Sequence, residues 1–401
     1  MKEILSLLHK AKWLVGGNFI FAFSQWFILI MLARMTTKEN LGQYALALAI
    51  VSPIFAVTNL QLRPLYILDE NSKREFTYAN FYYLRLISSI FALAVCFFFG
   101  FFSNVYIAVL LLVALIKFFE SFSDIIYAYY NAKDKTQLIS KSLLIKGFGS
   151  ILSVFLGLYF FNFYTALILF LLVYFLLWMF LDNLYIIKTT EVKEKKLNLS
   201  IMKTAIPMGV SLGIVTLQGN IPRLFMEKYL NVEAVGVFTV LTYFIIVGSI
   251  FINSICQYLS PRLTKAWYND KKYFKKLLLS ALGIAFVLGC SAIIFIHFLG
   301  EVVLKLVYGN SFLEYKNELS LVMFAGLFLY LATVIGYSLT SIGFIKKQIY
   351  LFSIVLLTTL VASYIFIPLY GIVGGIISLI LSYSVQFLAG LIVVFFGLRK
   401  E

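Results

Sequence analysis

The sequence predicts an all-α integral membrane protein with about twelve transmembrane helices, arranged as two lobes of six. Three observations lead to this prediction. Of the 401 residues, 62% are hydrophobic and only 13% are charged, whereas about a quarter of the residues of a soluble domain are charged. The chain contains twelve apolar stretches, each close to the roughly 20 residues that cross a bilayer. Lys and Arg residues gather in alternate loops, as they do on the cytoplasmic side of membrane proteins.

The twelve helices are bounded by the charged residues and turn formers that interrupt the apolar runs. They cover residues 13–34, 44–62, 79–101, 104–129, 137–160 and 163–184, then 204–222, 234–258, 277–299, 319–342, 348–369 and 371–397. The last two helices are joined by Tyr370-Gly371-Ile372-Val373-Gly374-Gly375, whose glycines permit a tight turn and close packing.

The distribution of positive charge orients the chain. The termini and the loops after even-numbered helices hold 24 Lys and Arg residues. The opposite loops hold only six, namely Arg34, Lys38, Arg223, Lys228, Lys305 and Lys316. Both termini are therefore expected in the cytoplasm, with an even number of spans between them. For so apolar a chain, the net charge of +15 indicates contact with anionic membrane lipids and not with nucleic acid.

The chain is expected to divide near its midpoint. Residues 1–184 form the N-terminal six-helix lobe, 185–203 a cytoplasmic linker and 204–401 the C-terminal six-helix lobe. An internal repeat supports this division. Leu41-Gly42-Gln43-Tyr44 and Val235-Gly236-Val237-Phe238 open the second helix of each lobe, 194 residues apart, and Gln25 and Gln218 lie in the preceding helices. The two halves are then parallel repeats about an axis along the membrane normal.

Charged side chains inside apolar stretches are the best functional candidates, because a charge at mid-membrane costs about 2.5–3.5 kcal/mol on insertion scales. Lys117, Glu120 and Asp124 fall on one face of the fourth helix. Arg85 lies on the third helix and Lys146 on the fifth. Neutral polar residues on the first, seventh and eighth helices are Asn18, Gln25, Gln218, Asn253 and Gln257.

These polar residues have two interpretations. In one, they form a structural network in which Lys117 pairs with Glu120, and Asp124 with Arg85 or Lys146. In the other, they line a water-filled cavity between helices one, three, four, five, seven and eight. A cavity with this excess of cations suits an anionic cargo, phosphate or pyrophosphate above all.

Three further residues have weaker assignments. Arg63, at the cytoplasmic end of the second helix, either joins the cationic cavity or snorkels to lipid headgroups. Pro53 and Pro207 are candidate hinge or gate points, because proline kinks a helix.

Cys96, Cys256 and Cys290 lie in separate apolar stretches and only two histidines are present, so no metal site, disulfide or cofactor is predicted.

Several short motifs follow one another along essentially the whole chain. They are Leu41-Gly42-Gln43-Tyr44, Asn59-Leu60-Gln61-Leu62-Arg63, Tyr83-Leu84-Arg85-Leu86, Lys117 to Asn131, Ile221-Pro222-Arg223, Tyr308-Gly309-Asn310 and Ile367-Pro368-Leu369-Tyr370-Gly371. By their order and spacing the chain resembles the polysaccharide biosynthesis or O-antigen flippase (Wzx-type) family, within the multidrug/oligosaccharidyl-lipid/polysaccharide (MOP) exporter superfamily.

The resemblance implies a multi-pass flippase of the bacterial cytoplasmic membrane that is not an enzyme. Such a protein moves an undecaprenyl-pyrophosphate-linked oligosaccharide, an O-antigen or capsule repeat unit, from the cytoplasmic to the periplasmic leaflet. The implied fold is MATE-like, with a V-shaped cavity that alternates its access. Relatives often couple to H+ or Na+, and Glu120 and Asp124 are the candidate proton carriers. Other membrane proteins of glycan assembly are further expected partners.

Two alternatives stay open. The first is another transporter of the superfamily, a drug or lipid exporter, against which the cationic cavity argues. The second is an enzyme such as an O-antigen polymerase, against which the short outer loops and the lack of paired carboxylates argue.

Overall fold

The structure is a computed structural model that describes residues 2–71, 76–182 and 199–399. Nearly all of these residues are helical and none of them forms a strand, which confirms the predicted all-α class. The chain forms two compact units, Met1–Thr216 and Leu217–Glu401. The predicted linker, residues 185–203, lies outside the described residues up to residue 198. The predicted lobe boundaries at 184 and 204 stay a prediction.

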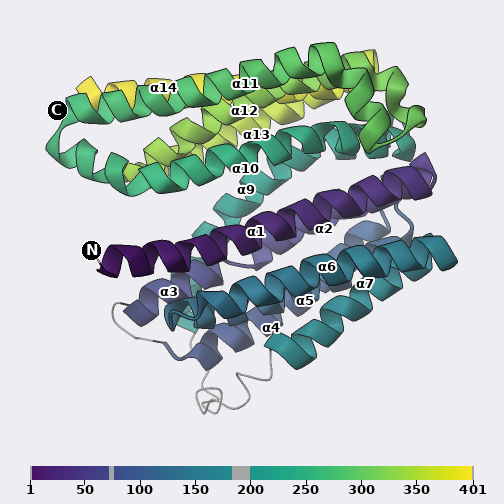
Figure 1. Ribbon diagram of the computed structural model, residues 1–401, viewed down its shortest axis with the longest axis horizontal. Coiled ribbons are helices and arrows are strands. Elements are labelled where there is room, and N and C mark those ends of the chain that lie inside the picture. Colours follow the sequence, from purple (N-terminus) through teal and green to yellow (C-terminus); the bar gives the residue numbers. More distant parts are fainter. Residues whose placement is uncertain (1, 72–75, 183–198, 400–401) are drawn as a thin grey trace. The chain divides into compact units, whose positions relative to one another are not determined.

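The first unit is organised around one central helix (Figure 1). Its elements are α1 (Lys2–Met35), α2 (Lys38–Thr58), α3 (Leu62–Asn71), α4 (Tyr78–Gly100), α5 (Ile107–Ala132), α6 (Thr136–Phe160), α7 (Phe163–Leu177), the π-helix η1 (Trp178–Asp182), the short η3 (Leu199–Ile201) and the start of α9 (Met202–Tyr229). Helix α5 contacts α2, α3, α4, α6 and α7, and α1 packs along α6. Helix α5 is therefore surrounded by five other helices of this unit.

The second unit consists of long helices that run alongside one another (Figure 1). After the end of α9 it contains α10 (Val232–Asn269), α11 (Lys271–Val307), the 3-10 helix η4 (Asn310–Tyr315), α12 (Lys316–Ser341), α13 (Ile345–Tyr370) and α14 (Ile372–Arg399). Helix α12 packs against α10, α11 and α14, and α13 packs against α14.

The helices agree with the predicted spans one for one. Eleven helical segments of the described chain are long and apolar enough to cross a membrane. The twelfth predicted span corresponds to α5, which is 26 residues long but carries Lys117, Glu120 and Asp124. These three charges lie close together and set α5 apart from the other eleven segments, although its length is ample at about 1.5 Å per residue. The orientation of the termini stays a prediction.

The second predicted helix, residues 44–62, is wrong in its end. Helix α2 stops at Thr58, and Leu60 and Gln61 adopt left-handed backbone angles, φ 52° and 50°, before α3 begins. A left-handed residue other than glycine costs roughly 1–2 kcal/mol. The segment contains no glycine, the residue that takes left-handed backbone angles without strain, so the usual sign of such a break is missing.

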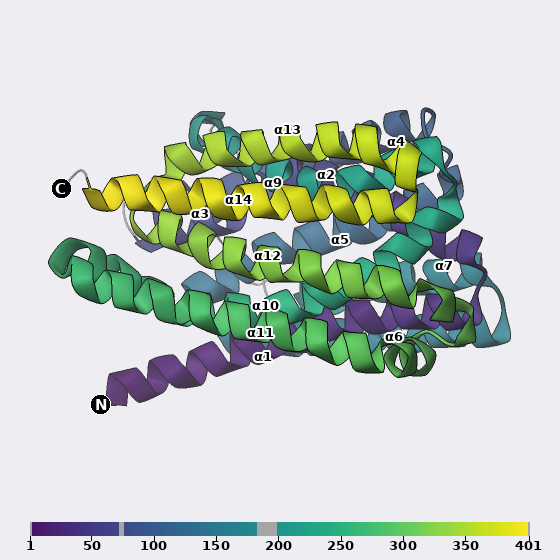
Figure 2. The same cartoon turned by 90° about the horizontal axis from the view of Figure 1, so that it is seen from above.

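The predicted loop between the eighth and ninth helices is also wrong. Helices α10 and α11 continue to a hairpin at Asp270, whose side chain accepts hydrogen bonds from the backbone N–H groups of Lys272 and Tyr273. Figure 2 shows the hairpin tip beyond the α12–α13 turn. The extension is held by buried Trp267, whose ring packs on Phe274 and Phe344. At 38 residues, α10 is about 57 Å long, well over a hydrocarbon core of about 30 Å.

Matching turns in the two units support the predicted duplication. Thr37 and Asn231 lie 194 residues apart, and each caps a helix by accepting a hydrogen bond from the backbone N–H three residues later. The α5–α6 and α12–α13 turns share one pattern of three backbone hydrogen bonds around a left-handed residue, Asp134 in one and Gly343 in the other. Gln25 and Gln218 are 193 residues apart, so they are not equivalent in this repeat.

The predicted tight turn at Gly371 is confirmed. Its φ of 59° falls in the left-handed region, which glycine enters without strain. The close packing predicted for the glycines of this segment is found at Gly374 and Gly375. A Cβ atom on Gly374 would lie 2.0 Å from the carbonyl oxygen of Phe366, and one on Gly375 would lie 2.1 Å from Met226.

Candidate functional site

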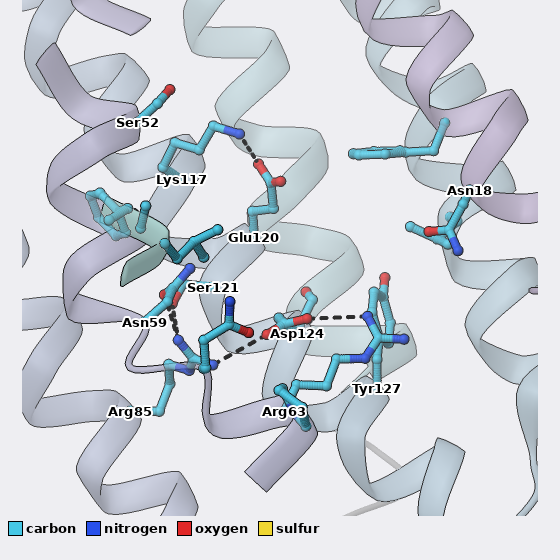
Figure 3. Close-up of a pocket in the computed structure, with 18 of the residues that line it drawn as sticks. Asn18, Ser52, Asn59, Arg63, Arg85, Lys117, Glu120, Ser121, Asp124 and Tyr127 are labelled. Carbon is cyan, nitrogen blue, oxygen red and sulfur yellow. Dashed lines mark hydrogen bonds and ion pairs between the residues drawn. The ribbon is translucent and has the colours of Figure 1, made fainter. Parts of the chain in front are cut away.

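A cavity of about 410 Å³ lies in the first unit. Its wall comes from α1, α2, the α2–α3 break, the start of α3, α4, α5 and α6, with Leu212 of α9 (Figure 3). Six charged residues line it, namely Arg63, Arg85, Lys117, Lys146, Glu120 and Asp124. The sequence had named all six as candidates, although they come from four separate helices. The excess of cations predicts a positive potential inside the cavity.

Asp124 holds two arginines at once. One carboxylate oxygen accepts a hydrogen bond from Arg63 Nη1 and the other from Arg85 Nη2, both at 3.2 Å. The Arg85 side chain is fully buried, whereas those of Arg63 and Asp124 are 25% and 33% exposed. Both guanidinium groups are therefore fixed at the cavity wall (Figure 3).

The α2–α3 break supplies the other partner of Arg85. Asn59, just after the end of α2, accepts hydrogen bonds from Arg85 Nη1 and from Ser121 Oγ, the latter at 2.6 Å. Helix α9 lies close to the break: a Cβ atom on Gly209 would be 2.5 Å from the Val57 carbonyl oxygen. The strained backbone thus places Asn59 and Arg63 at the cavity, and a regular helix through this segment would not.

Lys117 and Glu120 form an ion pair of 2.7 Å along α5, and their side chains are 29% and 36% exposed. This pairing, and that of Asp124 with Arg85, was predicted as the structural network. The alternative pairing of Asp124 with Lys146 is wrong. The same charged residues line a cavity, so the two interpretations of the sequence are not exclusive.

Lys146 pairs instead with Asp182, a residue that sequence reasoning missed. The Lys146 Nζ lies 2.5 Å from Asp182 Oδ2, and the two side chains are 2% and 1% exposed. The Nζ also donates to Ser123 Oγ and to the Tyr127 hydroxyl, the latter at 2.9 Å. Asp182 sits at the end of an apolar helix, where a carboxylate is usually solvated. The sequence feature that could have pointed to Asp182 is Lys146 itself, a cation in an apolar helix that requires an anionic partner.

The remaining candidates divide between the cavity and other places. Asn18 of α1 lines the cavity. Gln25, also on α1, donates a hydrogen bond to the Tyr174 hydroxyl of α7 at 3.5 Å. The other amides belong to the second unit, where Gln257 donates to the Tyr337 hydroxyl at 3.4 Å. Gln218 is buried, Asn253 is half-buried, and neither lines this cavity. The predicted seventh and eighth helices correspond to α9 and α10. Of the described residues that line the cavity, only Leu212 comes from these two helices.

The two prolines lie within continuous helices. Pro53 is buried in α2, and Pro207 is in the second turn of α9, where its carbonyl accepts from Ser211 Oγ at 2.7 Å. Their role as hinges stays a prediction.

Comparisons of the sequence with known proteins find polysaccharide biosynthesis proteins. A family profile described as polysaccharide biosynthesis protein matches residues 31–317. The capsular polysaccharide biosynthesis protein CapF of Staphylococcus aureus is 28% identical over 392 residues, which are 96% of this chain and 98% of that protein.

Solved structures show the fold. The lipid II flippase MurJ, in an inward closed conformation, is similar with a TM-score of 0.76 at 16% identity, over 95% of this chain and 87% of that one. An inward-facing multidrug resistance MATE family transporter of the MOP superfamily is similar with a TM-score of 0.69 at 14% identity, over 98% and 96% of the two chains. The predicted MATE-like helical fold is thereby confirmed.

Proposed function

The chain belongs to the polysaccharide biosynthesis protein family, and from this premise we propose that it is a flippase for a lipid-linked oligosaccharide. Its substrate is an undecaprenyl-pyrophosphate-linked repeat unit, which it moves from the cytoplasmic to the outer leaflet of the bacterial cytoplasmic membrane by alternating access. The likeness to CapF and to a lipid II flippase supports this class of cargo.

The cationic cavity is the observation that carries the proposal. Four cationic side chains and two carboxylates line it, among helices long enough to span a bilayer. Arginine offers a planar fork of donors that matches phosphate oxygens, and lysine offers a movable point charge. A pyrophosphate group presents the same kind of acceptor oxygens as Asp124, so it can take over the hydrogen bonds of Arg63 and Arg85.

The neutral part of the cavity suits the first sugar. Asn18, Ser52, Gln61 and Tyr127 supply amides and hydroxyls to its wall. These groups donate and accept hydrogen bonds, which is what the hydroxyl groups of a sugar require. The rival cargo, a cationic drug, would meet electrostatic repulsion at the same wall.

Flipping in reconstituted vesicles tests the proposal. Arg85→Ala, Lys117→Ala and Lys146→Ala each remove one cation of the cavity, and each should slow the flipping of a labelled undecaprenyl-pyrophosphate oligosaccharide at least about tenfold, the effect of roughly 1.4 kcal/mol. A proton or sodium gradient is imposed in separate arms, because the proposed driving force is one of these ions.

Lys272→Ala is the matched control, because Lys272 is exposed on α11 and does not line the cavity. It should flip the substrate at the wild-type rate. Size-exclusion profiles in detergent establish that every variant is folded. Wild-type flipping in all three cavity variants would contradict the cationic cavity as the binding site. Extension or joining of the glycans by the purified protein would instead identify a polymerase.

A further inference from the structure

Lys146 differs from the other cavity cations in the position of its counter-ion. Asp124 and Glu120 line the cavity themselves, with side chains 33% and 36% exposed. Asp182 does not line it, and its side chain is 1% exposed. The ion pair of Lys146 therefore has its cation at the cavity wall and its anion enclosed in protein.

The surroundings of Asp182 suit two protonation states. Ser142 Oγ donates to Oδ1 at 2.7 Å, and Ser123 Oγ donates to Oδ2 at 2.6 Å. The Tyr130 hydroxyl donates to the backbone carbonyl of Asp182 at 3.1 Å. A serine hydroxyl can donate or accept, whereas the ammonium group of Lys146 only donates. The two serines can therefore partner either a carboxylate or a carboxylic acid.

An anion in the cavity competes with Asp182 for Lys146. The lysine side chain is flexible and its charge is a compact point, so it can turn toward a phosphate group at the cavity wall. Asp182 would then be a buried carboxylate without a counter-ion, which is strongly unfavourable. Protonation removes that charge. The side chains of Glu120 and Asp124 are partly exposed at the cavity, so a displaced partner leaves them far less destabilised.

We propose that Asp182 is a proton-binding site linked to the cavity: a pyrophosphate group that takes Lys146 as its partner releases Asp182, whose carboxylate oxygen then binds one proton from water. This inference rests on the proposed function, and it moves the expected proton carrier from Glu120 and Asp124 to Asp182. By linkage, a lower pH must strengthen the binding of the anion as much as the anion favours protonation.

Other titratable and charged groups face the pair from the elements around it. They are Tyr127, Glu120 and Asp124 on α5, Tyr174 on α7 with its ring centre 5.9 Å from Lys146 Nζ, and Arg63, which lies 5.8 Å from the Tyr127 ring. The two carboxyl groups among them, Glu120 and Asp124, are partly exposed, whereas Asp182 is enclosed, so Asp182 is the group expected to gain the proton.

Infrared difference spectroscopy on the full chain in lipid nanodiscs tests the inference, with inorganic pyrophosphate as the probe. Pyrophosphate should produce the C=O stretching band of a newly protonated carboxyl group in the wild type. The double variant Lys146→Met/Asp182→Asn should lack this band. Removing both charges together avoids the unpaired buried lysine that Asp182→Asn alone would leave.

Binding measured against pH gives the second readout. Wild-type affinity for pyrophosphate should fall with rising pH more steeply than that of the double variant, by up to about tenfold per pH unit for one linked proton. The titration of pyrophosphate itself is common to both proteins and cancels in the comparison. Glu301→Gln, an exposed site on α11, is the control that should keep the wild-type slope and band.

Three outcomes decide the matter. The band and slope in the wild type, lost only in the double variant, support the inference. Equal slopes in both proteins, or loss of the band in Glu120→Gln, overturn it while leaving the proposed function intact. Failure of the wild type to bind pyrophosphate at any pH contradicts the proposed function and the inference with it.

Discussion

At the scale of single residues, Asp124 orients two of the four cationic side chains that line the cavity. One carboxylate fixes Arg63 and Arg85, so both guanidinium groups are oriented before any ligand arrives. A phosphate group that displaces the carboxylate finds donors already aligned, and their ordering entropy has already been lost in folding. In the proposed function, Asp124 therefore occupies the place that the anionic group of the substrate takes.

Removing this carboxylate should destabilise the protein. Asp124→Asn leaves the fully buried Arg85 without its anionic partner, and a buried charged donor that loses its partner costs about 1–3 kcal/mol or more. Glu120→Gln changes a pair with both side chains partly exposed, which is worth about 0–1 kcal/mol. Melting temperatures in detergent should therefore fall clearly for Asp124→Asn and little for Glu120→Gln. Equal melting temperatures for the two variants would contradict this account of Arg85.

At the scale of elements, the break between α2 and α3 and the α12–α13 turn show how unusual backbone angles fix helix ends. Leu60 and Gln61 hold their strain because Asn59 is bonded to α4 and α5 and because α9 packs on the break. Gly343 meets the same geometric need without strain, at a φ of 78°. The α2–α3 break contributes Asn59 and Gln61 to the cavity wall, whereas the α12–α13 turn only connects two helices.

Two alanine substitutions in this region should have opposite signs. Gly343→Ala forces a Cβ atom into the left-handed region and should destabilise the protein by roughly 1–2 kcal/mol, although no atom lies within 4 Å of the new carbon. Gly336→Ala, inside α12 and with its nearest neighbour 3.9 Å away, should stabilise by about 0.5–1 kcal/mol. Thermal unfolding of both variants measures this, and a shift of the same sign would refute the backbone argument.

Residues, and not whole elements, mark the limit of sequence reasoning here. The helical face of Lys117, Glu120 and Asp124 follows from the 3.6-residue period, so the cavity and most of its charges could be predicted. Asp182 could not, because its pairing with Lys146 depends on how η1 packs against α5 and continues from α7. The hairpin of α10 and α11 was missed because its buried Trp267 and Phe274 lie among lysines that are typical of a loop.

At the scale of the whole molecule, the twelve helices and the charge bias together fix an expected topology. The long α10 and α11 place Arg262, Lys265, Lys272 and Lys275 on a helical hairpin, beyond the length that the bilayer core requires. Their exposed side chains fit the cytoplasmic side, where anionic lipids attract basic segments.

Reporter fusions test this topology. A reporter fused after Lys400 should be active in the cytoplasm, because an even number of spans returns the chain to the side on which it began. A reporter inserted after Tyr315, in the segment before α12, should be active on the outside. A periplasmic signal from the C-terminal fusion would contradict the count of twelve. Signals from the same side for both fusions would contradict an odd number of spans between Tyr315 and Lys400.

The two units share their turns but not their chemistry. Within the described residues, the ion pairs with a fully buried member are Arg85–Asp124 and Lys146–Asp182, and both belong to the first unit. The polar candidates of the second unit, Gln218, Asn253 and Gln257, are neutral amides. Ion pairs with a buried member are thus unequally distributed between the two units. The proposed cargo is uneven in the same way, with its pyrophosphate at one end and a mostly neutral glycan at the other. We therefore expect changes of glycan specificity to accumulate in the second unit, while the ion-paired residues of the first unit stay the same for any sugar carried on the same lipid.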